Sequence, residues 1–276
     1  MTTQVSTRSF SVFGAGGGKS GFFTQLAMVT WRNMVTVART PEALLPPILI
    51  SVFFLVIYES TLGEAAGFIP NLSGNSYLGF ILPLSIVSAS LSGAGIAAQN
   101  VVRDIESGYF DKLLLTPISR GVLIIGPILA GALFLGLQAT IVLGVALLMG
   151  LESATGLGGI LLVIGLAILL GTGFAGFTVS AALGSGSAAA TQGASFIFFP
   201  LTFLTASFVP LELLSGWLRT AALFNPITYV LDAMRVALNS GWEWDVIGQG
   251  VLACAILATA MYLLAGYALR VRTRRK

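Results

Sequence analysis

The chain has 276 residues, of which 56% are hydrophobic and only 9% are charged, with a formal net charge of +3 and a mean hydropathy of +0.93. Charged residues make up about a quarter of a typical globular domain. The composition therefore excludes a water-soluble globular protein and predicts an all-α polytopic membrane protein. The absence of histidine and the single cysteine, Cys254, remove the commonest general base, the commonest metal ligand and any intrachain disulfide.

Residues 1–21 are polar and rich in Ser, Thr and Gly, and we expect them to form a flexible tail. Their GAGGGKS stretch resembles a phosphate-binding loop, but that motif requires a glycine where Phe13 stands and a strand before it. A nucleotide site in the tail is therefore rejected. No apolar signal-peptide core precedes residue 44, so the first membrane span is expected to direct insertion.

Residues 22–40 are predicted to form an amphipathic helix with Arg32 and Arg39 on its polar side. The helix is too polar to span a bilayer and suits the headgroup plane, with its arginines toward water. The alternative is a helix packed on a soluble partner. The following Thr40-Pro41-Glu42 is typical of a helix start and begins a transmembrane domain over residues 41–276.

Six apolar runs in this domain predict six transmembrane helices, since about 20 helical residues cross a hydrocarbon core. With the N-terminus inside, all lysines and arginines except Arg219 and Arg235 fall on the cytoplasmic side, as the positive-inside rule requires. We therefore expect a multi-pass protein of the cell membrane with both termini in the cytoplasm. The runs are 44–62, 77–98, 121–149, 158–183, 191–209 and 246–269.

The segment 210–240 contains apolar pieces that are too short and too charged to span a membrane. It begins at Pro210, and Asn225-Pro226 is typical of a cap and first turn between two short helices. Pro200 and Pro210 bracket the outer half of the fifth run, so we expect a broken helix there. An outer re-entrant helical hairpin is expected to follow before the last span; the alternative is an ordinary external loop.

The cytoplasmic loop 99–120 concentrates charge between two spans. Gly108 predicts a turn, and the residues after it can form two helical turns that end at Thr116-Pro117. An apolar ridge of Phe110, Leu113 and Leu114, flanked by Asp111, would suit docking into a groove on a partner. The alternatives are a plain solvated loop and a ridge that lies on the bilayer surface.

Glu59 is the one formal charge predicted at hydrocarbon depth, which makes it a candidate for function, although it could also extend outward to water. No carboxylate pair or nucleophile–base set is evident, so we predict no catalytic residue and no metal site. Glycines of the fourth run, such as Gly173, are expected to mark close helix packing. Aromatic residues that could line a substrate path or merely pack include Phe53, Tyr58, Phe199 and Phe203.

Two stretches resemble the type-2 permeases of ABC transporters, and most closely the daunorubicin-resistance-like exporters. The likeness covers nearly everything after residue 22, and Trp217-Leu218 stands where that family has its outer hairpin. The matching residues are Arg103, Glu106, Gly108, Leu113, Leu114, Pro117 and Arg120 in the first stretch, and Asn225, Pro226, Tyr229 and Arg235 in the second.

The resemblance implies two six-helix subunits, the second being a copy or a paralogue, each docked on a separate cytoplasmic ATPase. Loop 103–120 would be the coupling helix; ATP and Mg would bind the ATPase, and this chain would hold no cofactor. The substrate would be amphiphilic, such as a drug, lipid or glycolipid, with membrane lipids as neighbours and no nucleic acid as partner. Polysaccharide export, a passive channel or scaffold, and a lipid-handling membrane enzyme are the alternatives.

Overall fold

The computed structural model describes residues 21–63, 77–205 and 214–274, and every regular element in them is a helix. Most of the predicted tail and Pro210 lie outside the described residues. The helices are α1 (Phe22–Ala38), α2 (Pro41–Leu62), α3 (Tyr77–Glu106), α4 (Tyr109–Leu114), α5 (Arg120–Leu148), α6 (Gly156–Ser185), α7 (Ala188–Ser195), α8 (Phe198–Phe203), α9 (Gly216–Phe224), α10 (Pro226–Asn239) and α11 (Trp244–Arg274).

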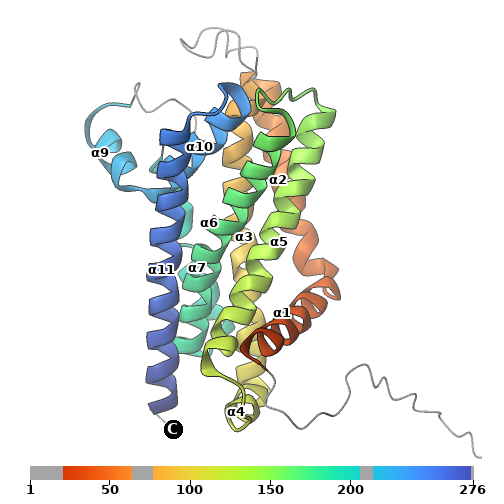
Figure 1. Ribbon diagram of the computed structural model, residues 1–276, viewed down its shortest axis with the longest axis vertical. Coiled ribbons are helices and arrows are strands. Elements are labelled where there is room, and N and C mark those ends of the chain that lie inside the picture. Colours follow the sequence, from red (N-terminus) through yellow and green to blue (C-terminus); the bar gives the residue numbers. More distant parts are fainter. Residues whose placement is uncertain (1–20, 64–76, 206–213, 275–276) are drawn as a thin grey trace, which may run out of the picture.

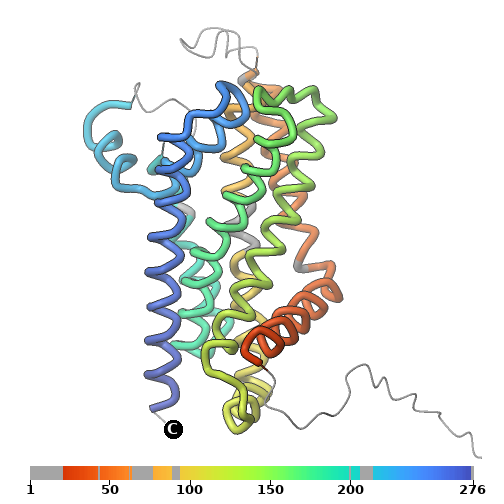
Figure 2. Tube along the Cα trace, in the orientation of Figure 1, coloured from red at the N-terminus to blue at the C-terminus, as the bar shows by residue number. Residues whose placement is uncertain are grey.

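The long helices α2, α3, α5, α6 and α11 run side by side along the longest axis of the molecule (Figures 1 and 2). α1 lies obliquely across the bundle near one end, where α4 and the last residues of α11 also lie. We call this the α4 end. α9 and α10 lie at the opposite end, which we call the α10 end.

Four described helices are long and apolar enough to cross a membrane: Leu44–Thr61 of α2, and α5, α6 and α11. The chain is therefore a multi-pass membrane protein. The second predicted run lies in α3, a 30-residue helix whose apolar part is Tyr77–Ser88. A helix of that length extends about 45 Å, which exceeds the roughly 30 Å hydrocarbon core. A total of six transmembrane spans stays a prediction.

The fifth predicted run, 191–209, is not one continuous helix. Its described part is divided between α7 and α8, with Phe196 and Ile197 between them. Pro200 explains the break, because its nitrogen has no proton to donate to the Phe196 carbonyl and its ring would collide with that carbonyl. Within α8, Pro200 lies in the first turn, where the missing proton costs nothing.

α6 lies at the centre of the bundle and packs on α3, α5, α10 and α11. A methyl group on Gly173 would lie 2.8 Å from Leu257 Cγ of α11, which confirms that this glycine permits close packing. Thr178 Oγ1 also donates a hydrogen bond to Ala94 O of α3 at 2.8 Å. By contrast, only 11% of the apolar segment of α2 is buried, so most of α2 faces outward.

Asn225 and Pro226 form the predicted cap and first turn of α10. Asn225 Oδ1 accepts a hydrogen bond from the Ile227 N–H at 3.0 Å, and Pro226 is the first helical residue. Asn225 Nδ2 donates to Leu201 O at 2.7 Å, which ties the cap to α8. The cap therefore fixes the direction in which α10 returns toward the bundle.

Candidate functional site

The candidate site is the corner where α3 ends, α4 follows and α5 begins. Gly108 has φ +70°, a left-handed conformation in which other residues are strained. Its N–H donates to Ile105 O at 3.1 Å, which ends α3 and redirects the chain into α4. Thr116 Oγ1 donates to Leu113 O at 2.6 Å and ends α4 in turn, and exposed Pro117 follows. The predicted turn at Gly108, the short helix after it and the end of that helix near Thr116-Pro117 are confirmed.

Phe110 is buried, with 3% of its surface exposed, so the prediction that it belongs to an exposed ridge is wrong. Its ring packs in a core cluster that includes Val101 of α3, Leu123 of α5, Val179 of α6 and Leu269 of α11. Leu113 and Leu114 pack partly against the same cluster. The physical reason lies in the spacing i, i+3, i+4, which is the pattern of a helix face that packs inward.

The most exposed apolar side chain of the corner is Leu115, the residue directly after α4, with 89% of its surface accessible. Leu115 was not predicted as a contact residue, because it lies outside the helix face that Phe110, Leu113 and Leu114 share. Tyr109, the first residue of α4, is 40% exposed. We give the name α4 surface to seven exposed residues of this corner: Arg103, Glu106, Tyr109, Lys112, Leu115, Pro117 and Arg120.

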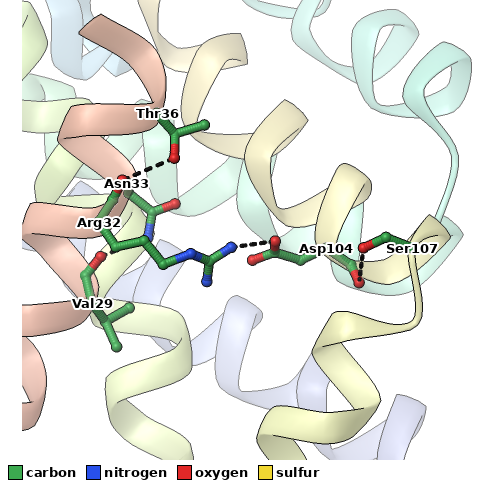
Figure 3. A network of polar contacts seen from close by, with 6 residues as sticks. All are labelled: Val29, Arg32, Asn33, Thr36, Asp104 and Ser107. Atoms are coloured by element: carbon green, nitrogen blue, oxygen red, sulfur yellow. Dashed lines mark hydrogen bonds and ion pairs between the residues drawn. The ribbon is translucent and has the colours of Figure 1, made fainter. Parts of the chain in front are cut away.

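α1 holds this corner through contacts that the sequence did not reveal. Arg32 forms an ion pair with Asp104 of α3 (Figure 3), and its guanidinium carbon lies 4.4 Å from the centroid of the Tyr109 ring. Gln25 Oε1 accepts a hydrogen bond from the Ser119 N–H at 3.1 Å. We call these five residues the α1 junction. Because they belong to α1, α3, α4 and the segment before α5, a displacement of α4 would also be felt by α1.

Arg32 itself is partly covered, with 37% of its side chain exposed, so the prediction that it faces water is only partly correct. Arg39 is exposed at the C-terminal end of α1, as predicted. The side of α1 that points away from the bundle is apolar: Phe23 is 82% exposed and Trp31 is 67% exposed. An exposed apolar side next to membrane-length helices suits contact with lipid.

Asp111 is half-buried, whereas Lys112 and Arg120 are exposed, so Asp111 is the less accessible docking group. No group of three or more His, Cys, Asp or Glu side chains placed to hold a metal ion occurs in the part of the chain that the structure describes. The chemistry available at the α4 surface is therefore contact with a partner by one large apolar side chain surrounded by charges.

The predicted residues of the outer hairpin are structural at their described positions. The Tyr229 hydroxyl donates to Leu223 O at 2.8 Å, which joins α10 to α9. Arg235 is buried, and its Nε donates to Phe80 O of α3 at 3.0 Å. Burial lowers the pKa of the Arg235 guanidinium to about 10, and Asp232 opposes that shift, so the group stays charged near neutral pH.

The predicted path residues lie on two different helices. On α2, Phe53 is 60% exposed, whereas Tyr58 and Glu59 are half-buried. Phe203, on α8, is 52% exposed. The Phe199 side chain lies outside the described residues. The structure brings Tyr58 and Glu59 to the α10 end, beside the start of α3, and their role in a path stays a prediction.

A family model described as ABC-2 type transporter matches residues 24–239, which include most of α1, the α4 corner and α10. The chain belongs to this family. The resemblance inferred from the two motifs is therefore confirmed, and both motifs lie within the matched residues.

Curated relatives of this ABC-2 protein are transporter permeases. It is 26% identical over 248 residues to the probable doxorubicin resistance ABC transporter permease protein DrrC of Mycobacterium tuberculosis, covering 89% of each chain. It is 29% identical over 262 residues to the daunorubicin resistance ABC transporter permease protein DrrB1 of Streptomyces coeruleorubidus, covering 92% of this chain and 88% of the relative. The putative transport permease ycf38 of Cyanophora paradoxa is 24% identical over 226 residues.

Proposed function

We propose that this ABC-2 permease is the membrane subunit of an ATP-driven exporter, and that the α4 surface docks a separate cytoplasmic ATPase. The observation that supports this most strongly is the combination of an exposed Leu115 with a buried Phe110. One side of the corner is free to bind a partner, while the other is fixed in the core.

Such an arrangement can transmit motion. The Phe110 ring contacts the core formed by α3, α5, α6 and α11, and the α1 junction adds a second attachment. Because a close-packed core deforms little, a push on α4 would shift the helices joined to it as a unit. An ATPase that changes shape could in this way change the conformation of the permease.

The distribution of basic residues supports a cytoplasmic position for the α4 end. At the α10 end the described basic residues are Arg219 and Arg235, and Arg235 is buried with Asp232 as its ion-pair partner. Cytoplasmic ends of membrane helices are enriched in Lys and Arg. The described basic residues at or near the α4 end are Arg32, Arg39, Arg103, Lys112, Arg120, Arg270, Arg272 and Arg274.

In this orientation α3 and the α7–α8 pair complete six spans, α1 lies in the inner headgroup layer, and α9 and α10 enter the outer leaflet from outside. The outward sides of α2 and α11, of which 11% and 17% are buried, then face lipid or a second permease subunit. ATP and Mg belong to the ATPase. The names of the relatives, which refer to doxorubicin and daunorubicin resistance, favour an amphiphilic drug-like or lipid-like substrate over a polysaccharide.

The test compares two leucines that are each 89% exposed at opposite ends of the molecule, Leu115 and Leu148. The permease is reconstituted in proteoliposomes with the ABC ATPase that copurifies with it. We expect Leu115→Asp to lower transport-dependent ATP turnover about tenfold or more, because a charge would be buried at the docking contact. Leu148→Asp should keep ATP turnover within about twofold of the wild-type value.

The proposal would be contradicted if Leu115→Asp had the transport-dependent ATP turnover of the wild type, or if substrate flux needed neither ATP nor the ATPase. The second result would instead indicate a passive channel. Both variants must first elute as folded protein in size-exclusion chromatography.

A further inference from the structure

A cavity of about 540 Å³ lies at the α4 end, between the end of α6 and the last turns of α11. Gly184, Ser185 and Tyr267 on its wall are exposed, so the cavity is open to the surroundings of the bundle. Its volume is in the range of ligand pockets in proteins. The other described residues that line it are three apolar residues and one charged residue: Leu183, Ala268, Val271 and Arg272.

Arg272 uses only part of its hydrogen-bonding capacity. Its Nη1 atom donates to Leu183 O at 3.1 Å and so caps the C-terminal end of α6. Its Nε atom is buried without a hydrogen-bond partner, and none of the ion pairs among the described residues includes Arg272. An arginine presents Nε and Nη2 side by side as a fork that matches two oxygens of a phosphate group. The described chain supplies no anion for this fork.

The charges around the cavity favour an anion. Arg270 and Arg274 are exposed on the same last turns of α11, and α11 contains no acid after its second residue. Five of the last seven residues of the sequence are basic. At the end of α3, Asp104 is paired with Arg32, and Glu106 is exposed to solvent, which screens its charge. The surroundings of the cavity are therefore positively charged.

The position of the cavity favours an anion that belongs to a lipid. α6 has 30 residues and extends about 45 Å, which exceeds the roughly 30 Å hydrocarbon core, so its ends reach the headgroup layers. On α11, Ile256, Leu263 and Tyr267 lie on one helix face and are 62%, 70% and 67% exposed. This apolar face leads to the cavity. A soluble anion would use the guanidinium alone, whereas a phospholipid would also use the apolar face.

We propose that the cavity binds the phosphate group of an anionic phospholipid, whose acyl chains lie along the exposed face of α11. Two phosphate oxygens accept hydrogen bonds from the guanidinium of Arg272, a half-buried side chain that can turn its unpaired edge toward the cavity. Basic pockets between membrane helices on the cytoplasmic side are typical sites for anionic headgroups, in agreement with the proposed orientation. The site lies outside the α4 surface and requires no ATPase.

The test measures lipid binding to the full-length chain in a neutral detergent by native mass spectrometry. The probes are phosphatidylglycerol and phosphatidylcholine with identical acyl chains. We expect the wild type to bind phosphatidylglycerol about tenfold more tightly, because the choline cation of the other lipid offsets the phosphate charge. Excess inorganic phosphate should not displace phosphatidylglycerol, because it cannot replace the contacts of the acyl chains.

Two pairs of variants separate the cavity from the general charge of α11. Arg272→Gln should lower the preference to about twofold or less, whereas Arg270→Gln, at an exposed position of the same helix, should keep it within about twofold of the wild type. Gly184→Leu fills the cavity and keeps Arg272, because an added Cβ atom has no neighbour within 4 Å. It should weaken phosphatidylglycerol binding about fivefold. Gly266→Leu, whose added Cβ atom is equally unhindered outside the cavity wall, should not weaken it.

Three results would overturn the inference: equal binding of the two lipids to the wild type, equal effects of Arg272→Gln and Arg270→Gln, or displacement of the lipid by inorganic phosphate. If Arg272→Gln does not fold, the comparison of Gly184→Leu with Gly266→Leu decides, since both variants keep the cap on α6. No ATPase is present in this experiment, so its failure would leave the role of Leu115 unaffected.

Discussion

Phe110 and Leu115, five positions apart, have opposite roles at the α4 corner. Phe110 is enclosed by the core, and Leu115 is almost fully accessible. A substitution at Phe110 should therefore act mainly on stability, and one at Leu115 mainly on partner binding. This difference separates a folding defect from a coupling defect with two variants of one loop.

Phe110→Ala is expected to lower the free energy of unfolding by about 3–5 kcal/mol, because it removes a buried ring and leaves a cavity. Leu115→Ala, the matched control, should change it by less than about 0.5 kcal/mol. The measurement is denaturant unfolding of both purified variants in the same micelle. Equal stability of the two would show that Phe110 is not enclosed as described.

At the scale of elements, α1 is attached to the α3–α4 corner by a small number of polar contacts. The ion pair between Arg32 and Asp104 is partly exposed, with 37% and 18% of the side chains accessible. Such pairs contribute about 1 kcal/mol or less. The attachment can therefore open without disturbing the core, which makes α1 a candidate for movement during coupling.

Arg32→Ala should release α1 locally. We expect amide hydrogen exchange in the second half of α1 to become about fivefold faster, as an opening free energy reduced by about 1 kcal/mol implies. Exchange in α6 should not change. Arg39→Ala serves as the control, since Arg39 is exposed at the end of the same helix; an equal acceleration in that variant would contradict the role assigned to the ion pair.

The features that could be predicted from the sequence are those that a few neighbouring residues determine. The Asn225-Pro226 cap, the left-handed turn at Gly108 and the close packing at Gly173 all follow from side-chain size or a neighbouring backbone proton. The break in the fifth run near Pro200 has a local cause as well, the missing proton of the proline nitrogen.

The burial of Phe110, Leu115 as the exposed tip, and the pairing of Arg32 with Asp104 depend on contacts between residues far apart in the chain. Residues 32 and 104, for example, are 72 positions apart. Hydrophobic periodicity identifies an apolar side of a short helix but does not say whether protein, lipid or a partner covers it. The apolar face of Phe110, Leu113 and Leu114 was therefore predicted to contact a partner, whereas the core of the same chain covers it.

At the scale of the whole molecule, docking of a cytoplasmic ATPase on the α4 surface requires the α4 end to face the cytoplasm. Replacing the buried Cys254 by Ala gives a background without cysteine, into which Lys112→Cys or Glu152→Cys is introduced. Both positions are exposed, at opposite ends. In intact cells a membrane-impermeant maleimide should label the cysteine at 152 and spare the one at 112; the reverse pattern would contradict the orientation.

The central claim, that the α4 surface binds the ATPase, is tested most directly by site-specific cross-linking. A cysteine replaces Leu115 in the Cys254→Ala background, carries a photoreactive maleimide and is irradiated in membranes that contain the copurifying ATPase. We expect a covalent product of permease and ATPase, with a yield that changes when ATP is added. A product from a cysteine at Leu148 but not at Leu115, or no product with the ATPase at either position, would contradict the account.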